Sequence, residues 1–196
     1  MKSKTLIIVV ILGLIFMLVS TAISSYNSMV TLDEGVKEKW SQVENVYQRR
    51  ADLIPNLVNT VKGYAAHEKE TFEAVINARA KATAVNINAD NLDAAKLKQF
   101  QEAQQGLSGA LSRLMVVVER YPELKANQNF LELQAQLEGT ENRIAVERKK
   151  FNESVKLYNK TIRVFPKNIF AGIFGFSQKA YFEAKPGSDV APEVKF

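Results

Sequence analysis

The single histidine of the chain begins a partial metal-binding motif. His67-Glu68-Lys69-Glu70-Thr71 has the first histidine and the glutamate of the helical motif that holds zinc in many proteases. That motif needs a second histidine one turn later, because two imidazoles on one helix face bind the ion. Thr71 occupies that position, and the chain has no cysteine to take its place. We therefore predict no metal site and no cofactor, and we interpret His67 as a residue at a helix end.

Other arrangements that support catalysis are also missing from the sequence. Gly106-Leu-Ser-Gly109 is not followed by the Gly-Lys-Ser/Thr of a phosphate-binding loop, and no Gly-x-Ser-x-Gly nucleophile motif occurs. Helical bundles that hold two iron ions need two Glu-x-x-His pairs, which one histidine cannot supply. The chain is therefore predicted not to be an enzyme.

Charged and amide side chains gather at two distant places in the chain, around Pro55 and near Glu141. We call five of them the candidate polar network: Arg50, Asp52, Asn56, Glu141 and Arg143. If the two helices that carry them are antiparallel neighbours, these groups face one another. We expect a hydrogen-bonded ion-pair network that fixes the register of the helices. A polar anchor for a small ligand or a lipid is the alternative.

The spacing of apolar residues predicts the first helix that carries this network. From Met29 to Tyr64, apolar residues alternate at intervals of three and four, which is typical of a helix packed along its length. Pro55 lies inside this pattern and should kink the helix near Asp52. Gly63 should end it.

Three further helices are expected, over residues 67–84 and 93–120 and from Asn127 or Asn129 to just before Pro166. Asparagine is a good helix cap, and the residue before a proline avoids helical dihedral angles. Short loops make neighbouring helices antiparallel, and no alternation typical of strands occurs. We therefore predict an all-α fold in which residues 26–166 form an antiparallel up-and-down four-helix bundle.

Ahead of this bundle, the stretch from Leu6 to Ile23 is apolar and carries no charge. As a helix it would extend about 27 Å, close to the ~30 Å hydrocarbon core of a bilayer. We predict an N-terminal membrane anchor over residues 1–25. Its membrane-spanning helix contains Leu6, Ile11, Phe16 and Ile23. Ala22-Ile23-Ser24 resembles a cleavage site, so a cleaved signal peptide is the alternative.

The charge balance bears on both partners and orientation. Lys2 and Lys4 lie ahead of the apolar stretch, and removing them lowers the net charge from +5 to +3. A domain so close to neutral has no electrostatic footprint for nucleic acid. Lysines ahead of a spanning helix favour an N-terminus inside the cell. We therefore predict a single-pass protein of a bacterial cell membrane, with an extracytoplasmic, periplasmic helical domain; the opposite orientation is the alternative.

Residues 167–196 differ in composition, because aromatic side chains crowd their first part. We call four of these the candidate aromatic patch: Phe170, Phe174, Phe176 and Tyr181. The prediction is an irregular tail that packs back on one end of the bundle, with loop residues at Pro186-Gly187 and Pro192. A surface that faces lipid or a partner protein is the alternative.

Several ordered blocks of the sequence resemble the signature of the LemA family. They are Arg49-Arg-Ala-Asp-Leu-Ile-Pro-Asn-Leu-Val58, Val61-Lys-Gly-Tyr-Ala-Ala-His-Glu68, Leu133-Gln-Ala-Gln-Leu-Glu-Gly-Thr-Glu-Asn-Arg-Ile144, Phe151-Asn152, Tyr158-Asn159, Phe174-Gly-Phe176 and Tyr181-Phe-Glu-Ala-Lys-Pro-Gly187. The resemblance implies a bacterial envelope protein with a membrane segment, a helical bundle and no associated enzymatic activity. Some relatives carry a lipobox cysteine where Ser25 stands here, which also implies a domain outside the cytoplasm. One branch of the family helps to build magnetosome membranes, and some members neighbour a membrane protease.

The residues and the resemblance together predict a non-catalytic, membrane-anchored scaffold or adaptor that acts through protein–protein contacts. The expected partners are the lipid bilayer and an envelope protein, for which a membrane protease is one candidate. A second copy of the chain is another candidate, and nucleic acid is not expected. A bundle that binds a small ligand or a lipid at the membrane is the alternative function.

Overall fold

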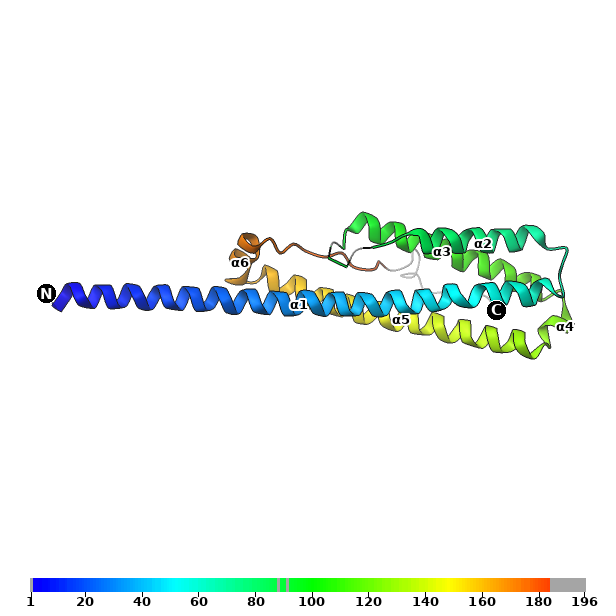
Figure 1. Ribbon diagram of the computed structural model, residues 1–196, viewed down its shortest axis with the longest axis horizontal. Helices are drawn as coiled ribbons and strands as arrows, with labels where there is room; N and C mark the ends of the chain where they lie inside the picture. Colours follow the sequence, from blue (N-terminus) through cyan, green and yellow to red (C-terminus); the bar gives the residue numbers. More distant parts are fainter. Residues whose placement is uncertain (1, 88, 91, 184–196) are drawn as a thin grey trace, which may run out of the picture.

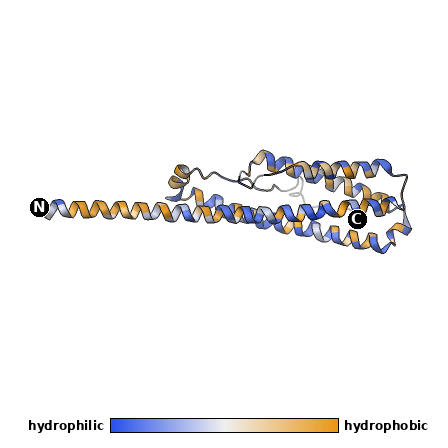
Figure 2. Ribbon diagram, in the orientation of Figure 1, coloured by the Kyte–Doolittle hydropathy of each residue, from blue (hydrophilic) through white to orange (hydrophobic). Residues whose placement is uncertain are grey.

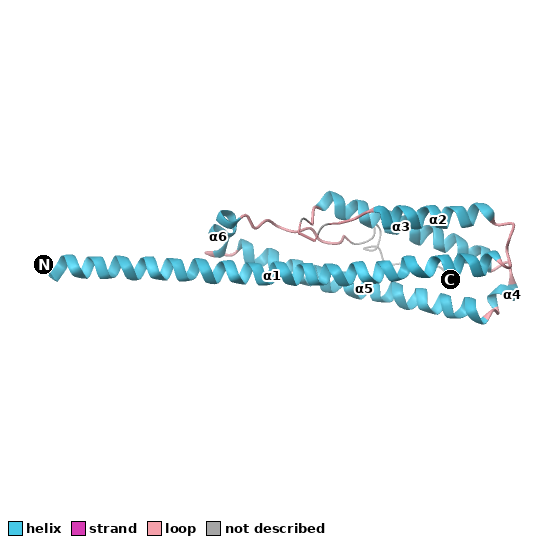
Figure 3. Ribbon diagram, viewed as in Figure 1, coloured by secondary structure: helices cyan, strands magenta, loops and turns pink. Residues whose placement is uncertain are grey.

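The computed structural model describes residues 2–87, 89–90 and 92–183, and every regular element among them is a helix (Figure 3). The helices in chain order are α1 Lys2–Lys62, α2 Lys69–Ala84, α3 Ala94–Val118, α4 Pro122–Lys125, α5 Gln128–Arg163 and α6 Lys167–Phe174. The all-α prediction is thereby confirmed for the described part of the chain.

One continuous helix, α1, joins the apolar N-terminal stretch to the folded part of the protein. Its 61 residues extend about 90 Å at 1.5 Å per residue. Every side chain from Leu6 to Ser20 is exposed, and Figure 2 shows hydrophobic colour along this isolated part of α1. Among the described residues, α1 is the one helix long and apolar enough to cross a membrane. The first buried side chain described along it is Ser25, which is 3% exposed.

The four longer helices, α1, α2, α3 and α5, pack as two pairs rather than as four equivalent neighbours. In Figure 1, α5 runs alongside the C-terminal part of α1, and α2 and α3 lie together as a second pair. α1 and α5 are antiparallel, because Asn127 Nδ2 donates to Tyr64 Oη at 3.0 Å near one end, and Lys167 Nζ donates to Ser28 Oγ at 2.9 Å near the other. The four-helix bundle stays a prediction in its finer detail.

The helix ends follow local capping chemistry. The Asp93 side chain accepts a hydrogen bond from Ala95 N at the start of α3, and the Asn127 side chain accepts one from Phe130 N at the start of α5. α1 ends at Lys62, immediately before Gly63, as predicted. α2 begins at Lys69, two residues later than expected.

α1 continues through Pro55 to Lys62. Proline has no backbone N–H, so the carbonyl oxygen of Ala51 loses its donor from the next turn. Arg79 on α2 replaces that donor, because its Nε donates to Ala51 O at 2.7 Å. A side chain from a neighbouring helix therefore satisfies the carbonyl that the proline leaves without a partner.

The apolar core consists of two clusters along the long axis. The first contains most of the buried aromatic residues: Tyr47, Trp40, Phe100, Phe151, Tyr158 and Phe182. The second lies toward the C-terminal end of α1 and is mainly aliphatic: Ile54, Leu57, Val61, Val75, Leu107, Leu114 and Leu124, with Phe72 and Phe130. Between the two clusters, the buried polar side chain on α1 is Arg50, and the one on α3 is Gln104. A polar layer thus divides the core.

The region after Pro166 is more regular than the predicted irregular tail. Residues 167–174 form α6, which ends at Gly175 in the left-handed conformation (φ 78°), where Phe176 N bonds Ala171 O at 2.9 Å. Glycine is needed there because it alone enters that conformation without steric cost. Residues 176–183, which we call the C-terminal strap, have no helix or strand. The predicted loop residues Pro186, Gly187 and Pro192 lie outside the described residues.

Candidate functional site

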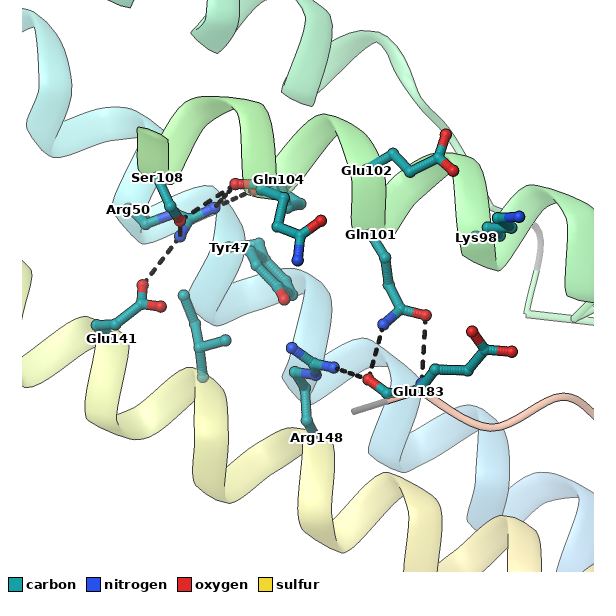
Figure 4. Close-up of a pocket in the computed structure, with 12 residues that line it drawn as sticks. Tyr47, Arg50, Lys98, Gln101, Glu102, Gln104, Ser108, Glu141, Arg148 and Glu183 are labelled. Carbon is teal, nitrogen blue, oxygen red and sulfur yellow. Dashed lines mark hydrogen bonds and ion pairs between the residues drawn. The ribbon is translucent and has the colours of Figure 1, made fainter. Parts of the chain in front are cut away.

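Arg50 is the centre of the polar layer. It is 3% exposed and bonds to two other helices. Its Nη1 donates to Glu141 Oε2 on α5 at 2.9 Å and to Ser108 Oγ on α3 at 3.1 Å (Figure 4). Its Nη2 donates to the backbone oxygen of Gln104 at 3.3 Å and to Gln104 Oε1. The guanidinium also lies over the Tyr47 ring, 5.1 Å from the centroid. One buried cation therefore joins α1, α3 and α5.

Gln104 extends this network to the fourth long helix. Its Nε2 donates to the carbonyl oxygen of Ala82, near the end of α2, at 3.2 Å. Arg79, also on α2, bonds the backbone of Ala51, the residue that follows Arg50. These bonds cross helix boundaries at a single level of the long axis. The arrangement fixes the helices against sliding, since a shift along any axis would leave a buried donor or charge without a partner.

The structure brings together two of the five residues of the candidate polar network. Arg50 and Glu141 form the ion pair, in which the Glu141 side chain is 48% exposed. Asp52 is exposed and accepts a hydrogen bond from Gln48 Nε2 at 2.8 Å. Asn56 is also exposed, and Arg143 lines an open groove between α1 and α5. The last three therefore do not take part in the buried layer.

The sequence interpretation missed Gln104, although the apolar spacing of α3 indicates that this side chain is buried. Leu97, Phe100, Gln104, Leu107 and Leu111 follow intervals of three and four, so Gln104 occupies a position where an apolar residue is expected. A polar residue at such a position needs a buried partner. The spacing therefore marks Gln104 as a candidate buried polar residue, although it does not identify Arg50 as the partner.

A partly open cavity of about 150 Å³ lies beside the polar layer, lined by Tyr47, Arg50, Gln101, Arg148 and neighbouring residues (Figure 4). Pockets for drug-sized ligands hold roughly 300–1,000 Å³. The volume suits a few water molecules or a very small polar molecule. No group of three or more His, Cys, Asp or Glu residues that could hold a metal ion occurs in the described part of the chain.

Two asparagine side chains of α5 hold the C-terminal strap by hydrogen bonds to its backbone N–H and C=O groups. Asn159 accepts from Lys179 N at 2.9 Å and donates to Lys179 O at 2.8 Å. Asn152 accepts from Phe182 N at 2.9 Å and donates to Phe182 O at 3.0 Å. Each asparagine therefore satisfies both backbone groups of one strap residue, as a neighbouring strand would.

The spacing of the two asparagines matches the spacing of their partners. Asn152 and Asn159 lie seven residues apart on α5, which is about 10.5 Å along a helix. Lys179 and Phe182 lie three residues apart, which is about 10 Å along an extended chain. The two distances agree, so an extended segment fits against α5 without a bulge. The Phe151-Asn152 and Tyr158-Asn159 pairs of the sequence thus place an aromatic ring in the core and an amide beside the strap.

Side chains of the strap complete the first apolar cluster. The Phe182 ring stacks on Trp40 at a centroid distance of 5.9 Å and meets Phe151 edge-on at 5.3 Å. The Lys179 side chain is 7% exposed, and its Nζ bonds Asp33 Oδ1 on α1 at 2.8 Å. The strap therefore supplies both an aromatic residue and a paired charge that the helices would otherwise lack.

The electrostatics of this region shift several pKa values. Burial raises the pKa of the Tyr47 hydroxyl, while the charges of Arg148 and Arg50 lower it in part. Burial, together with the nearby Asp33 carboxylate, raises the pKa of Tyr158 to about 12. Both shifts favour the neutral phenol, so neither tyrosine is poised to act as a base near neutral pH.

The residues of the candidate aromatic patch have different surroundings. Phe174 and Phe176 meet the Tyr26 ring of α1 edge-on, at 5.1 and 5.9 Å between centroids. Phe170 and Phe176 are half-buried against the first cluster, while Phe174 and Tyr181 are each 42% exposed. The most exposed apolar side chains of the region lie elsewhere: Phe165, Ile169 and Ile173.

Comparison with known proteins gives one family and several relatives. The sequence model of the LemA family matches residues 39–196 of the chain. The magnetosome protein MamQ of Magnetospirillum gryphiswaldense is 30% identical over 196 residues, covering 90% of this chain and 72% of MamQ. The magnetosome protein MamQ 2 of Paramagnetospirillum magneticum is 31% identical, covering 87% of this chain and 69% of the relative. Protein LemA of Metamycoplasma hominis is 23% identical, covering 81% and 68%.

Proposed function

Because the chain belongs to the LemA family, we propose that it is a non-catalytic, membrane-anchored scaffold or adaptor that acts through protein–protein contacts. Residues 1–25 anchor it, residues 26–166 form a helical bundle of the family type, and residues 167–183 pack on that bundle. The bundle lies outside the cytoplasm, on the periplasmic side of the cell membrane. Its partner is an envelope protein, for which a membrane protease and a second copy of the chain are the candidates.

The observation that carries this proposal is the continuity of α1. The same helix presents an uncovered apolar surface before Ser25 and supplies core residues such as Met29, Val36 and Trp40 after it. No loop separates the anchor from the bundle, so the bundle would be held rigidly above the bilayer. A rigid support that holds other proteins at a fixed distance from the membrane suits a scaffold better than an enzyme.

The names of the relatives agree with a role at a membrane-bounded structure. MamQ proteins are named as magnetosome proteins. The alternative function, a bundle that binds a small ligand or lipid, has less support from the geometry. Two partly open cavities adjoin its polar anchor, Arg50 and Glu141. Their volumes are about 150 and 350 Å³, so only the second reaches the lower end of the range for ligand pockets.

Anchoring is tested by charging the apolar stretch. The variant Leu12→Arg/Ile15→Arg places two charges in the proposed span, each costing about 2.5–3.5 kcal/mol at the middle of a spanning helix. We expect the parent protein to stay in the membrane pellet after a carbonate wash and the variant to be released. The bundle should remain helical, because both positions are exposed. Release of the parent protein by the wash would contradict anchoring.

Scaffolding is tested by photocrosslinking in intact cells. A photoreactive residue at Val146, which is 49% exposed on α5 and lines the groove between α1 and α5, should give discrete adducts with a protein. The same residue at Phe16 is the control for contacts inside the bilayer. Absence of any protein adduct from Val146 and from other exposed positions of α1 and α5 would contradict a scaffold. External protease added to whole cells and to spheroplasts then tests on which side the bundle lies.

A further inference from the structure

We propose that α6 and Phe165 form an interfacial contact that lies in the headgroup layer of the same bilayer and favours anionic phospholipids. The inference rests on the proposed anchor and deepens it. In Figure 1, α6 is the element of the folded part that lies nearest the free N-terminal stretch of α1. Figure 2 shows hydrophobic colour on both.

The contacts of α6 fix its level along α1. Lys167 Nζ bonds Ser28 Oγ at 2.9 Å, and the Phe174 ring lies 5.1 Å from the ring of Tyr26. Tyr26 follows Ile23, the end of the apolar stretch, by three residues, or about 4.5 Å along the helix. A bilayer has a hydrocarbon core of about 30 Å within a total of about 40–45 Å, which leaves about 5–8 Å of headgroup layer on each side. α6 therefore lies at headgroup depth when the stretch spans the membrane.

α6 has one face on the protein and another that is apolar and uncovered. Ala171 is 3% exposed, whereas Ile169 and Ile173 are 52% and 69% exposed. Ile169 and Ile173 are one turn apart on the same face, and Ala171 lies on the opposite side of the helix. Phe165, just before the helix, is 80% exposed. Apolar side chains at this depth gain from leaving water, as in helices that lie in the membrane interface.

The charges in the chain segment that contains α6 all have one sign. The acidic groups beside it, Asp33 and Asp90, are paired with Lys179 and Lys37. No Asp or Glu occurs between Glu153 and Glu183, and α1 carries no charge between Lys4 and Asp33. The basic residues in the first of these intervals are Lys156, Lys160, Arg163, Lys167 and Lys179. Lys179 is paired with Asp33, but Lys160 and Arg163 are exposed at the end of α5 that adjoins α6. Cations next to an apolar face at headgroup depth match a surface of anionic phospholipids.

The bilayer explains this face better than a second copy of the chain. The uncovered side chains of α6 adjoin the uncovered apolar surface of α1, so one bilayer covers both. Tyr26, 44% exposed between them, is the residue type found at membrane interfaces. A second copy would have to cover the patch while its own anchor occupied the same membrane.

The absence of cysteine in the chain allows a depth measurement with single-cysteine variants. The full chain is reconstituted at one copy per nanodisc, with an NBD fluorophore on Ile173→Cys. Phe16→Cys, inside the proposed span, and Val116→Cys, exposed on α3, serve as matched references. We expect NBD at position 173 to emit at a shorter wavelength than at position 116. We also expect dithionite to reduce it several-fold more slowly than at position 116, but faster than at position 16.

The reference positions separate the two proposals. Protection at position 16 with full accessibility at position 173 would overturn the interfacial contact and leave the anchor standing. Accessibility at both positions would overturn the anchor and the inference together. Protection at position 173 that appears only when discs hold two or more copies would assign the face to self-association and overturn the lipid contact.

Lipid composition tests the preference for anionic headgroups. Protection at position 173 should be greater in discs of phosphatidylcholine with phosphatidylglycerol than in phosphatidylcholine alone. The Lys160→Gln/Arg163→Gln variant should lose that difference while position 16 stays protected. Equal protection in both lipid compositions would overturn the preference.

Discussion

Arg79 donates a hydrogen bond from Nε to the backbone oxygen of Ala51, at 2.7 Å, across the boundary between α2 and α1. This carbonyl lies four residues before Pro55 and so has no donor within its own helix. The bond lets α1 continue past a proline and also ties the α2–α3 pair to the long helix. It lies next to Arg50, so one level of the molecule holds both the proline and the buried cation.

The pairing of Arg79 with Ala51 predicts an interaction between two substitutions. Arg79→Ala should lower the free energy of unfolding by about 1–3 kcal/mol, because it leaves a partly buried carbonyl without a donor. In a Pro55→Ala background the backbone N–H is restored, and the same substitution should cost much less. Chemical denaturation of the four proteins in this double-mutant cycle measures the difference. Equal costs in both backgrounds would show that Arg79 does not compensate for the proline.

Removing the charge of Arg50 should destabilise the bundle. Arg50→Met takes away the donor to the buried Gln104, whereas the half-exposed Glu141 carboxylate is hydrated, and we expect a loss of about 1–3 kcal/mol. Arg143→Met makes the same change at an exposed position of α5 and should stay within about 0.5 kcal/mol of the parent. Thermal or denaturant unfolding followed by circular dichroism compares the two. Similar losses for both would mean that the buried layer does not hold the helices together.

Releasing the C-terminal strap should expose Trp40, the only tryptophan of the chain, to solvent. Asn159→Ala removes both bonds to Lys179 and should cost about 1–3 kcal/mol, since the backbone groups lose buried partners. Phe182 would then leave the face of Trp40, so acrylamide should quench Trp40 fluorescence more strongly. Asn142→Ala, at an exposed position of the same helix, is the control and should leave quenching unchanged. If Trp40 stays protected in Asn159→Ala, the amide does not hold the strap.

Stability should fall in alkaline solution partly because of Tyr158. Burial and the Asp33 carboxylate raise its pKa to about 12 from an ordinary value of 10.0. The folded chain therefore holds the phenolic proton more tightly than the unfolded chain. This contribution is complete below about pH 10 and is lost as the pH rises through about 12. Tyr158→Phe should make the loss of unfolding free energy above pH 10 less steep. A parent and a Tyr158→Phe variant with the same slope would contradict the assignment.

The helices and the apolar stretch followed from local patterns. Intervals of three and four, the caps Asp93 and Asn127 and the stop at Gly63 depend on residues within one or two turns, so they can be read along the chain. The pairing of Arg50 with Glu141 was predicted because Arg50 interrupts such a pattern and Glu141 lies on a helix that was expected to be its neighbour. The same reasoning included Asp52, Asn56 and Arg143, which are exposed, because periodicity gives a face and not the depth of a side chain.

By itself, then, the sequence determined the helical class, the end of α1, the bounds of α2, α3 and α5 to within a few residues, the uncharged apolar stretch and the absence of catalytic motifs. Only the tertiary structure decided that Gln104 completes the Arg50 layer, that Asn152 and Asn159 hold the strap, and that α6 lies beside Tyr26. The physical reason is that these contacts join residues from 20 positions apart in the chain (Asn159 and Lys179) to 148 apart (Tyr26 and Phe174). A contact over such a separation depends on how the helices are placed against one another, and no spacing within one helix specifies that placement.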